Sequence, residues 1–420
     1  MHPFDMTTKG YTMKKFFSIL LCLCFVTDLL TGCSENSSNS ELPTLTLALR
    51  EGIYSDVIRE CIHTFEQKKL LHCEILELSE DELHSLVAQD ADQKSGAYDL
   101  CMVDGSWMAE YTHDGILADL SELGYEIDED IIPATTKVCY HEDHVYLAPY
   151  YGNVTVLLYN KIIIERTGHS TDDMACMTDV LKICRDATRR GHLGFMYRGD
   201  TTNNIVVDFL PILSSFGGWV TDTENHPVVN TPEFEKALKF YLELIHTGKA
   251  ESRDNLIVAI ANNAAAMAVG WPGWYTPAKK STADYCAFTG KAEKDSTAYN
   301  ANVYGIWTLG IPANSAKKDL AIELLNYLMD KDVQKETVSY GGVPCRYSSL
   351  RDEKILEEFP QYEAVCNALE NGIYRPIMVE WPAFYEILGT EMNQIINGEK
   401  GIKEGLADAQ RQLEILCSDS

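Results

Sequence analysis

The chain has 420 residues and a formal net charge of −28, with 35 basic and 63 acidic side chains. This length is enough for two domains of ordinary size, each with a sizeable hydrophobic core. The acidity argues against nucleic acid and anionic substrates as partners, because both need a basic patch. It suits a solvated surface around a neutral or cationic ligand.

The N-terminal segment has the pattern of an export signal. From Met13 it reads Lys14 and Lys15, then an apolar run over 16–26, then Leu-Thr-Gly-Cys at 30–33. The apolar run is too short to span a bilayer, so we expect residues 1–32 to be a signal peptide that is removed. Met1 and Met13 both stay open as the true start.

The residues at 30–33 also resemble the bacterial lipobox, which implies a diacylated Cys33 after cleavage. Residues 33–43 would then be the lipidated cysteine and a flexible polar tether. We therefore predict a lipid-anchored protein on the extracellular face of the cell membrane, or on the periplasmic face where the envelope has an outer membrane. An ordinary secreted protein is the alternative.

The thirteen cysteines could suggest a disulfide framework, but three of them lie at or before Cys33. The other ten are scattered and form no CxxC pair. Several lie within apolar runs, where a free thiol behaves as a small hydrophobe. We expect buried thiols rather than disulfides.

Strand-like and helix-like segments alternate at the start of the mature chain. Short apolar runs over 45–49, 72–78 and 98–104 are typical of strands buried in a parallel sheet. Apolar residues recur at helical spacing between them, which predicts an α/β lobe with right-handed crossovers. Ligands of such sheets bind beyond the carboxyl ends of the strands. We therefore expect the residues after 49 and after 103 to face a ligand.

A second α/β lobe is indicated further along the chain. Apolar runs flank a polar turn within 137–161, and Thr231 with Pro232 begins a strongly amphipathic helix. A returning strand is expected within 303–315, then a helix, and two more helices are expected within 384–416. No interior linker is rich in Gly, Ser or Pro. The chain should therefore cross between the lobes more than once.

Several segments of the mature chain carry a more specific signal: YDLCMVDGSWMAEYTHDGIL, VYLAPYYGNVTVLLYNK, SSFGGWV, AAAMAVGWPGW, LGIPANS, GGVPCR and ILGTEMNQIINGEKGIKEGLADAQRQL. In their order and spacing they resemble the extracellular solute-binding proteins of family 1, the lipid-tethered receptors of ABC sugar importers. The resemblance implies an α/β, two-lobed, periplasmic-binding-protein-like fold of class II with a ligand cleft between the lobes. The N-terminal lobe would comprise 44–150 plus about 310–345, and the C-terminal lobe 151–309 plus about 346–420.

The resemblance also implies a function. The chain would be a receptor and not an enzyme, binding a carbohydrate, an oligosaccharide, in the cleft and delivering it to the permease of an ABC transporter. It would use no cofactor and no metal. It would contact the membrane through its lipid anchor, bind no nucleic acid and act as a monomer.

The stretch 264–277 places Trp271 and Trp274 on either side of a Pro-Gly turn. A sugar has apolar C–H faces and a ring of hydroxyls, so its site needs flat aromatic walls together with carboxylate, amide and guanidinium groups. The resemblance places this turn beside the cleft. We expect one of the two indoles, Trp274 before Trp271, to stack on the ligand. The alternative is that both cap the core of the lobe.

Further candidate ligand contacts come from the two strand ends and from the resemblance, which points to the segment entering the second lobe and to GGVPCR. Some have plain structural alternatives: a helix cap for Asp104, a salt bridge for Arg346 and core packing for tryptophans near loops. The candidates are Glu51, Tyr54, Asp104, Trp107, Tyr151, Asn153, Trp219, Arg346 and Trp381.

Other functions stay open from the sequence. A lipid-anchored secreted glycosidase that uses two carboxylates is the strongest enzyme alternative. The same fold could also bind a polyamine or another polar solute, or serve a sensor. Ser-Ala-Lys-Lys at 315–318 fits a β-lactamase pattern, but Ser315 is expected to cap the next helix. The His-Glu-Asp-His run at 141–144 is expected to be a solvated turn and not a metal site.

Overall fold

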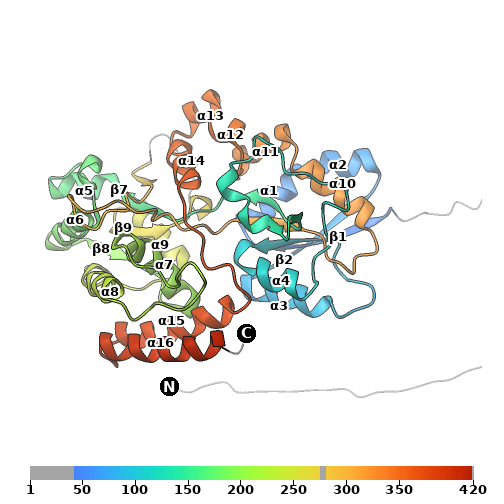
Figure 1. Ribbon diagram of the computed structural model, residues 1–420. Helices are drawn as coiled ribbons and strands as arrows, with labels where there is room; N and C mark the ends of the chain where they lie inside the picture. The colour runs from blue at the N-terminus through green and yellow to red at the C-terminus, as the bar shows by residue number, and fades with distance from the viewer. Residues whose placement is uncertain (1–41, 275–280, 419–420) are drawn as a thin grey trace, which may run out of the picture. The chain divides into compact units, whose positions relative to one another are not determined.

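The computed structural model describes residues 42–274 and 281–418 (Figure 1). This part of the chain contains a five-stranded sheet, the centre of the N-terminal lobe, and a four-stranded sheet, the centre of the C-terminal lobe. No helix within these two ranges combines the length and the apolar character needed to cross a membrane. The predicted signal peptide, Cys33 and the tether up to residue 41 lie outside the described residues.

The sheet of the N-terminal lobe has the strand order β2-β1-β3-β11-β6. β1 runs parallel to β2 and β3, whereas β11 runs antiparallel to β3 and β6. The three strands predicted for this lobe are confirmed, although the third begins two residues later than expected. The bounds are β1 Thr44–Arg50, β2 His72–Leu78, β3 Leu100–Asp104, β6 Ala148–Tyr151 and β11 Trp307–Gly310.

The first helices of the N-terminal lobe begin close to the carboxyl ends of its parallel strands: α1 follows β1, α3 follows β2 and the 3-10 turn η1 follows β3. The first turn of α3 is fixed by Ser79, whose hydroxyl accepts a bond from the Glu82 N–H while the Glu82 carboxylate accepts one from the Ser79 N–H. This reciprocal cap satisfies two backbone donors at the helix start. The helices are α1 Ile53–Cys61, α2 His63–Lys69, α3 Glu80–Asp90, α4 Met108–His113, α10 Lys318–Leu328 and α11 Lys331–Thr337, with 3-10 turns η1 Gly105–Trp107, η2 Pro133–Thr135, η3 Lys137–Cys139 and η6 Val338–Tyr340. The chain continues through α12 Tyr347–Leu350, α13 Glu353–Glu358 and α14 Tyr362–Glu370.

The sheet of the C-terminal lobe has the order β10-β7-β9-β8. The predicted start of α8 is confirmed, since the Thr231 hydroxyl accepts a bond from the Phe234 N–H and Pro232 is the first helical residue. The elements are β7 Val156–Asn160, β8 Leu193–Met196, β9 Ala265–Gly270, β10 Ala283–Cys286, α5 Lys161–Thr167, α6 Met177–Arg189, α7 Thr202–Ser215, α8 Pro232–Ile245, α9 Arg253–Ala261, α15 Trp381–Ile396 and α16 Ile402–Ser418, with 3-10 turns η4 Thr171–Asp173 and η5 Pro272–Trp274.

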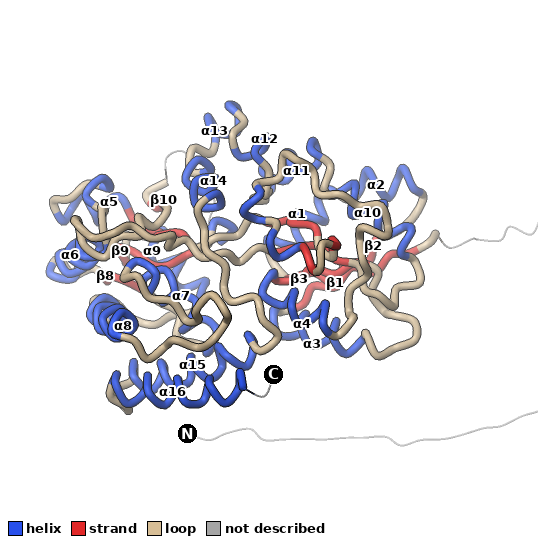
Figure 2. The backbone as a smooth tube through the Cα atoms, viewed as in Figure 1, coloured by secondary structure: helices blue, strands red, loops and turns tan. Residues whose placement is uncertain are grey.

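In the described part of the chain, the connection between the lobes is made by three segments and not by one linker (Figure 2). The β6–β7 segment pairs with the β10–β11 segment through an isolated bridge between Val154 and Tyr304. The latter segment pairs in turn with the α14–α15 segment through a bridge between Val303 and Ile373. The predicted multiple crossing is therefore confirmed.

The polar turn predicted at 141–144 is a hairpin. It joins two short strands, β4 Tyr140–His141 and β5 His144–Val145. Glu142 and Asp143 both have positive φ, 47° and 67°, the left-handed conformation that a two-residue hairpin turn requires. Among the described residues no cluster of His, Cys, Asp or Glu is arranged to hold a metal ion.

Buried side chains form two clusters. The first surrounds the five-stranded sheet and continues onto one face of the four-stranded sheet, with Leu158 of β7 and Tyr285 of β10, whereas the second covers the other face of the four-stranded sheet. The buried residues of α12 and α14 belong to the first cluster, whereas those of α15 and α16 belong to the second. Because the first cluster contains residues of both sheets, the lobe boundary near 346 that the resemblance implies stays a prediction.

Two smaller expectations concern side chains in the core. All ten described cysteines are free thiols, as predicted, and eight of them are buried. The expected cap at Ser315 is wrong: α10 begins at Lys318 with Lys317 as its cap residue. The Ser315 hydroxyl instead donates to the Asp99 carboxylate at 2.8 Å. It also accepts a bond from the Lys317 N–H at 3.1 Å and so holds the turn before the helix.

Candidate functional site: a cavity between the two sheets

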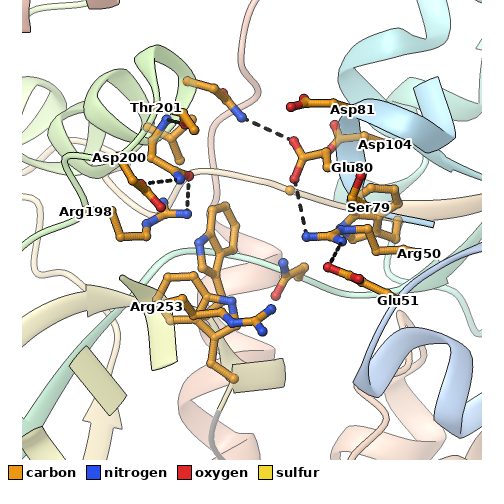
Figure 3. A pocket seen from close by; sticks show the side chains of 18 of the residues that line it. Arg50, Glu51, Ser79, Glu80, Asp81, Asp104, Arg198, Asp200, Thr201 and Arg253 are labelled. Atoms are coloured by element: carbon orange, nitrogen blue, oxygen red, sulfur yellow. Dashed lines mark hydrogen bonds and ion pairs between the residues drawn. The ribbon is translucent and has the colours of Figure 1, made fainter. Parts of the chain in front are cut away.

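A cavity of about 410 Å³ is lined by residues of both lobes. On the N-terminal side they follow the carboxyl ends of β1, β2 and β3, where the sheet rule places ligands. On the C-terminal side they come from the first turns of α7 and α9 and from η5. Figure 3 shows the two sides facing each other, with Arg50, Glu51, Glu80, Asp81 and Asp104 opposite Arg198, Asp200, Thr201 and Arg253.

Asp104 ends β3 at the wall of the cavity. Its Oδ1 accepts bonds from the backbone N–H and the hydroxyl of Ser106, at 2.8 and 2.7 Å, and from Arg375 Nη2 at 2.6 Å. The Asp104 and Arg375 side chains are 6% and 8% exposed. Asp104 therefore faces the cavity and also caps η1, which are the two positions that the sequence analysis considered for it.

Tyr54 and Asn153 form a pair at the bottom of the site. The Asn153 amide nitrogen donates to the Tyr54 hydroxyl at 3.2 Å, and the Tyr54 ring packs on Tyr151 and Trp307 at 4.8 and 5.6 Å between centroids. Burial raises the pKa of Tyr54 to about 12, so its hydroxyl keeps its proton at neutral pH. The Asn153 Oδ1 is buried and accepts no hydrogen bond from any described residue.

Glu80 lies at the start of α3 and connects the two sides of the cavity. Its Oε1 accepts a bond from Asn203 Nδ2, at the start of α7, at 3.2 Å. Its Oε2 lies 4.0 Å from Arg50 Nη2. Partial burial at the cavity wall, where the Glu80 side chain is 34% exposed, and then the nearby Asp104 carboxylate raise the pKa of Glu80. Its carboxylate therefore has one amide partner and only a distant counter-charge.

Arg198 and Trp274 form the opposite wall. The Arg198 Nε donates to Asp208 Oδ1 at 3.1 Å, and Asp208 is completely buried inside α7. The guanidinium lies over the Trp274 ring, 4.8 Å from the centroid. One indole face is thus covered by a cation that a buried carboxylate holds in place.

The two indoles of the Trp-Pro-Gly-Trp turn differ in exposure. Trp271 is 8% exposed and packs against the crossing segment so closely that a Cβ at Gly305 would lie 2.7 Å from its ring. Trp274 is only partly buried. Both line the cavity, together with Trp307 of β11.

The structure brings six predicted contacts to this cavity and leaves five outside its lining. The six are Glu51, Tyr54, Asp104, Asn153, Trp271 and Trp274. Tyr151 and Trp107 lie behind the wall: Tyr151 donates to the Gly341 carbonyl at 2.7 Å, and Trp107 packs edge-on against Trp307 at 5.5 Å. Their rings support wall residues without lining the cavity themselves.

The other three predicted contacts are structural in this fold. Arg346 is 1% exposed, with its guanidinium 2.8 Å from Asp128 and 3.3 Å from Asp130. Trp381 is completely buried and stacks on Phe384, and Trp219 packs against the core of the C-terminal lobe. Arg346 therefore forms the salt bridge, and the two tryptophans the core packing, that the sequence analysis gave as alternatives to ligand contact.

Sequence reasoning missed part of the lining. The capping box that starts with Ser79 directly after the second strand was a readable signal for Glu80 and Asp81. The side chains near the starts of α7 and α9, and Arg375, had no comparable signal, because their distance from the first sheet is set by the crossing segments. The missed lining residues include Arg50, Glu80, Asp81, Arg198, Asp200, Asn203, Arg253, Arg375, Tyr385 and Glu386.

Comparison with known proteins gives a consistent result. A family model described as bacterial extracellular solute-binding protein matches residues 74–335. A probable amino-acid ABC transporter periplasmic-binding protein of Sinorhizobium fredii is 20% identical over 427 residues, covering 97% of this chain and 96% of the relative.

Solved structures share the fold. An ABC transporter solute-binding protein from Agrobacterium radiobacter K84, in complex with ribitol, matches with a TM-score of 0.79 at 22% identity, over 90% of this chain and 99% of that chain. Maltose-bound MalE3 of T. maritima matches with a TM-score of 0.78 at 21% identity, over 89% and 99%. The predicted two-lobed α/β fold is confirmed by these matches.

Proposed function

Because the chain belongs to the bacterial extracellular solute-binding protein family and is thus the solute-binding protein of an ABC transporter, we propose that it binds a carbohydrate in the cavity between the lobes. It delivers this solute to the permease while anchored to the membrane through a lipid on Cys33. Members of this family are receptors without catalytic activity, which removes the glycosidase alternative. A carbohydrate, and in particular an oligosaccharide, is the solute that we expect.

The observation that carries the carbohydrate proposal is the composition of the wall. Three indoles, Trp271, Trp274 and Trp307, line a cavity that also presents carboxylates, amides and guanidinium groups. Aromatic faces suit the C–H faces of a sugar, and the polar groups suit its hydroxyls. Solved structures of the same fold contain ribitol and maltose, which supports this solute class.

The relative described as an amino-acid binder makes an amino acid the natural competitor. An amino acid would need a free cation, or free backbone N–H groups at a helix start, for its carboxylate. The arginines among the described lining residues are already paired with carboxylates: Arg50 with Glu51, Arg198 with Asp208, Arg253 with Asp254 and Arg375 with Asp104. This pairing favours a solute without a carboxylate.

A thermal-shift screen followed by calorimetric titration tests the solute class. The panel should hold mono- and oligosaccharides, polyols, polyamines and amino acids. We expect saturable binding of a carbohydrate or polyol at micromolar affinity or better, which corresponds to about 8 kcal/mol. Binding of amino acids or polyamines alone would contradict the carbohydrate proposal.

The lipid anchor has its own test. Full-length protein expressed in a bacterial host should fractionate with membranes, and mass spectrometry should find a diacylglycerol adduct on Cys33. Cys33→Ala should release the protein from the membrane fraction without changing its thermal unfolding, because residue 33 lies in the predicted tether before β1. A mature N-terminus at another residue would contradict the anchor.

A further inference from the structure

The charge balance of the cavity is strongly unequal. Among the described lining residues there are four arginines and seven carboxylates. Each arginine already has a carboxylate partner, and the partner of Arg198 is Asp208, which lies behind the wall. The surplus of negative charge that faces the cavity is therefore not compensated by these side chains.

Four of the described lining carboxylates have no arginine partner at a distance below 4.0 Å, and three of them we call the acidic corner: Glu80 and Asp81 at the start of α3, and Glu386 of α15. The fourth, Asp200, lies on the other side of the cavity and accepts a bond from Asn204 Nδ2 at 2.8 Å (Figure 3). The side chains of Asp81 and Glu386 form no hydrogen bond or ion pair with any other residue that the structure describes. Tyr385 lines the same cavity as these three carboxylates, and burial and then their charges raise the pKa of its phenol. Glu80 itself has an amide partner and Arg50 only at 4.0 Å.

A second observation is independent of charge. Asn153 is 4% exposed and lines the cavity, and its Oδ1 accepts no bond from the described residues. The buried Oδ1 of Asn203, on the amide that reaches Glu80, is likewise without a partner. A buried acceptor without a donor is costly, so a bound solute should supply donors. The unsatisfied groups of this cavity are thus acceptors.

An ammonium group answers both observations, because it carries a positive charge, donates three hydrogen bonds and accepts none. A hydroxyl can donate to an acceptor but leaves the surplus charge unpaired. The cation–π position over Trp274 is already filled by Arg198, so the indole wall is left for the ring of the solute. We propose that the natural solute is an amino-bearing carbohydrate or polyol whose protonated amine lies against Glu80 in the acidic corner. This inference rests on the proposed function, since it specifies the solute class of the same site.

The test uses matched compounds that differ only at nitrogen. Hexoses with the gluco, galacto and manno configurations are each titrated as the 2-amino, the 2-acetamido and the parent 2-hydroxy sugar. Glucamine with sorbitol, and chitosan disaccharide with cellobiose, extend the comparison, and putrescine is the amine without a sugar. We expect at least one amino compound to bind about ten- to hundredfold more tightly than its neutral partners at pH 7, the effect of one added charge-assisted contact.

The outcomes separate this inference from the proposed function. Neutral sugars or polyols that bind as tightly as their amino partners would overturn the inference and leave the carbohydrate function intact. Putrescine binding without any carbohydrate would overturn the carbohydrate function, and so would a panel in which nothing binds. In either case the inference falls with the function.

Glu80→Gln keeps the shape of the side chain and removes its charge. The variant should lose most of the preference for the amino compound and keep the affinity for its neutral partner. Glu224→Gln, at a side chain that is 79% exposed, makes the same change of net charge outside the cavity and should keep the preference. An equal loss in both variants would show a long-range charge effect and overturn the assignment to Glu80. Thermal unfolding of both variants checks that they are folded.

Discussion

The two sides of the cavity reach the same space by different means. The N-terminal side consists of side chains at the carboxyl ends of parallel strands, and its carboxylates are only partly paired. The C-terminal side consists of helix starts and a 3-10 turn, and its main cation, Arg198, is held by the buried Asp208. The N-terminal side thus presents the carboxylates of Glu80 and Asp81, whereas the C-terminal side presents Trp274 under a guanidinium that is held in place. A solute bound between them contacts carboxylates on the N-terminal side and the Trp274 indole on the C-terminal side.

The largest expected effect tests the wall of Arg198 and Trp274. Asp208→Asn leaves Arg198 buried without its counter-charge, and removing one partner of a buried ion pair costs about 3–5 kcal/mol. Urea unfolding should show a loss of this size. Asp200→Asn, at an exposed carboxylate just before α7, is the matched control and should change the unfolding free energy by less than about 0.5 kcal/mol. Equal losses would mean that Arg198 does not depend on Asp208.

A second test separates the two indoles by stability. Trp271→Ala removes a ring that is 8% exposed and packed on Gly305, so it should cost about 3–5 kcal/mol of unfolding free energy. Trp274→Ala removes a ring that is only partly buried and should cost clearly less. The same urea titration applied to both variants measures the difference. A smaller loss for Trp271→Ala would reverse the roles assigned to them.

The third test concerns binding. If Trp274 stacks on the solute, Trp274→Ala should weaken binding by about 1–3 kcal/mol, or roughly ten- to hundredfold, in calorimetric titration. Trp219→Ala is the control, because that ring packs on the C-terminal core outside the cavity lining. It should retain affinity. If Trp274→Ala binds the solute with an affinity within a factor of about two of the unmutated protein, Trp274 is not part of the proposed sugar platform.

The smallest expected effect is the pH dependence of the acidic corner. The folded-state pKa of Glu80 is raised above its unfolded value, so the folded protein binds this proton more tightly. Stability without solute should therefore fall as the pH rises from about 4, the unfolded value, through the raised pKa. Comparison of urea unfolding of the protein and of Glu80→Gln across this range isolates the contribution. The groups that face Glu80 are Arg50, Asp81, Asp104, Arg198, Asn203, Arg375, Tyr385 and Glu386.

If the Glu80 contribution to the unfolding free energy instead rises with pH, the neighbouring cations lower the pKa of Glu80 more than burial and Asp104 raise it. Binding of an amino compound should respond in the other direction, because the amine pairs with the ionised carboxylate. Its affinity should fall as the pH drops through the raised pKa of Glu80. The affinity for the matched neutral compound should depend less on pH. The pH profile of stability thus reports the burial of Glu80, and the pH profile of affinity reports how its charge recognises the amine.

The local sequence determined the features that depend on neighbouring residues. Short apolar runs between amphipathic segments identified the strands of the first sheet, and the sheet rule placed Glu51, Tyr54 and Asp104 at the ligand edge. The Thr231–Pro232 start of α8 followed from the bonding of a single cap. Ordered motifs along the chain indicated the family and, with it, the turn that carries Trp271 and Trp274. None of these features requires knowledge of distant contacts.

Only the tertiary structure decided which polar and aromatic side chains reach the cavity. Arg346 has the chemistry of a sugar contact, but its partners Asp128 and Asp130 lie 218 and 216 residues away in sequence and hold its buried guanidinium in an ion pair away from the cavity. Arg375 shows the converse, since the last crossing segment brings it to Asp104, 271 residues away, at the cavity wall. Burial and ion pairing depend on which segments pack together. In a chain that crosses between two lobes three times, that packing has no local signature.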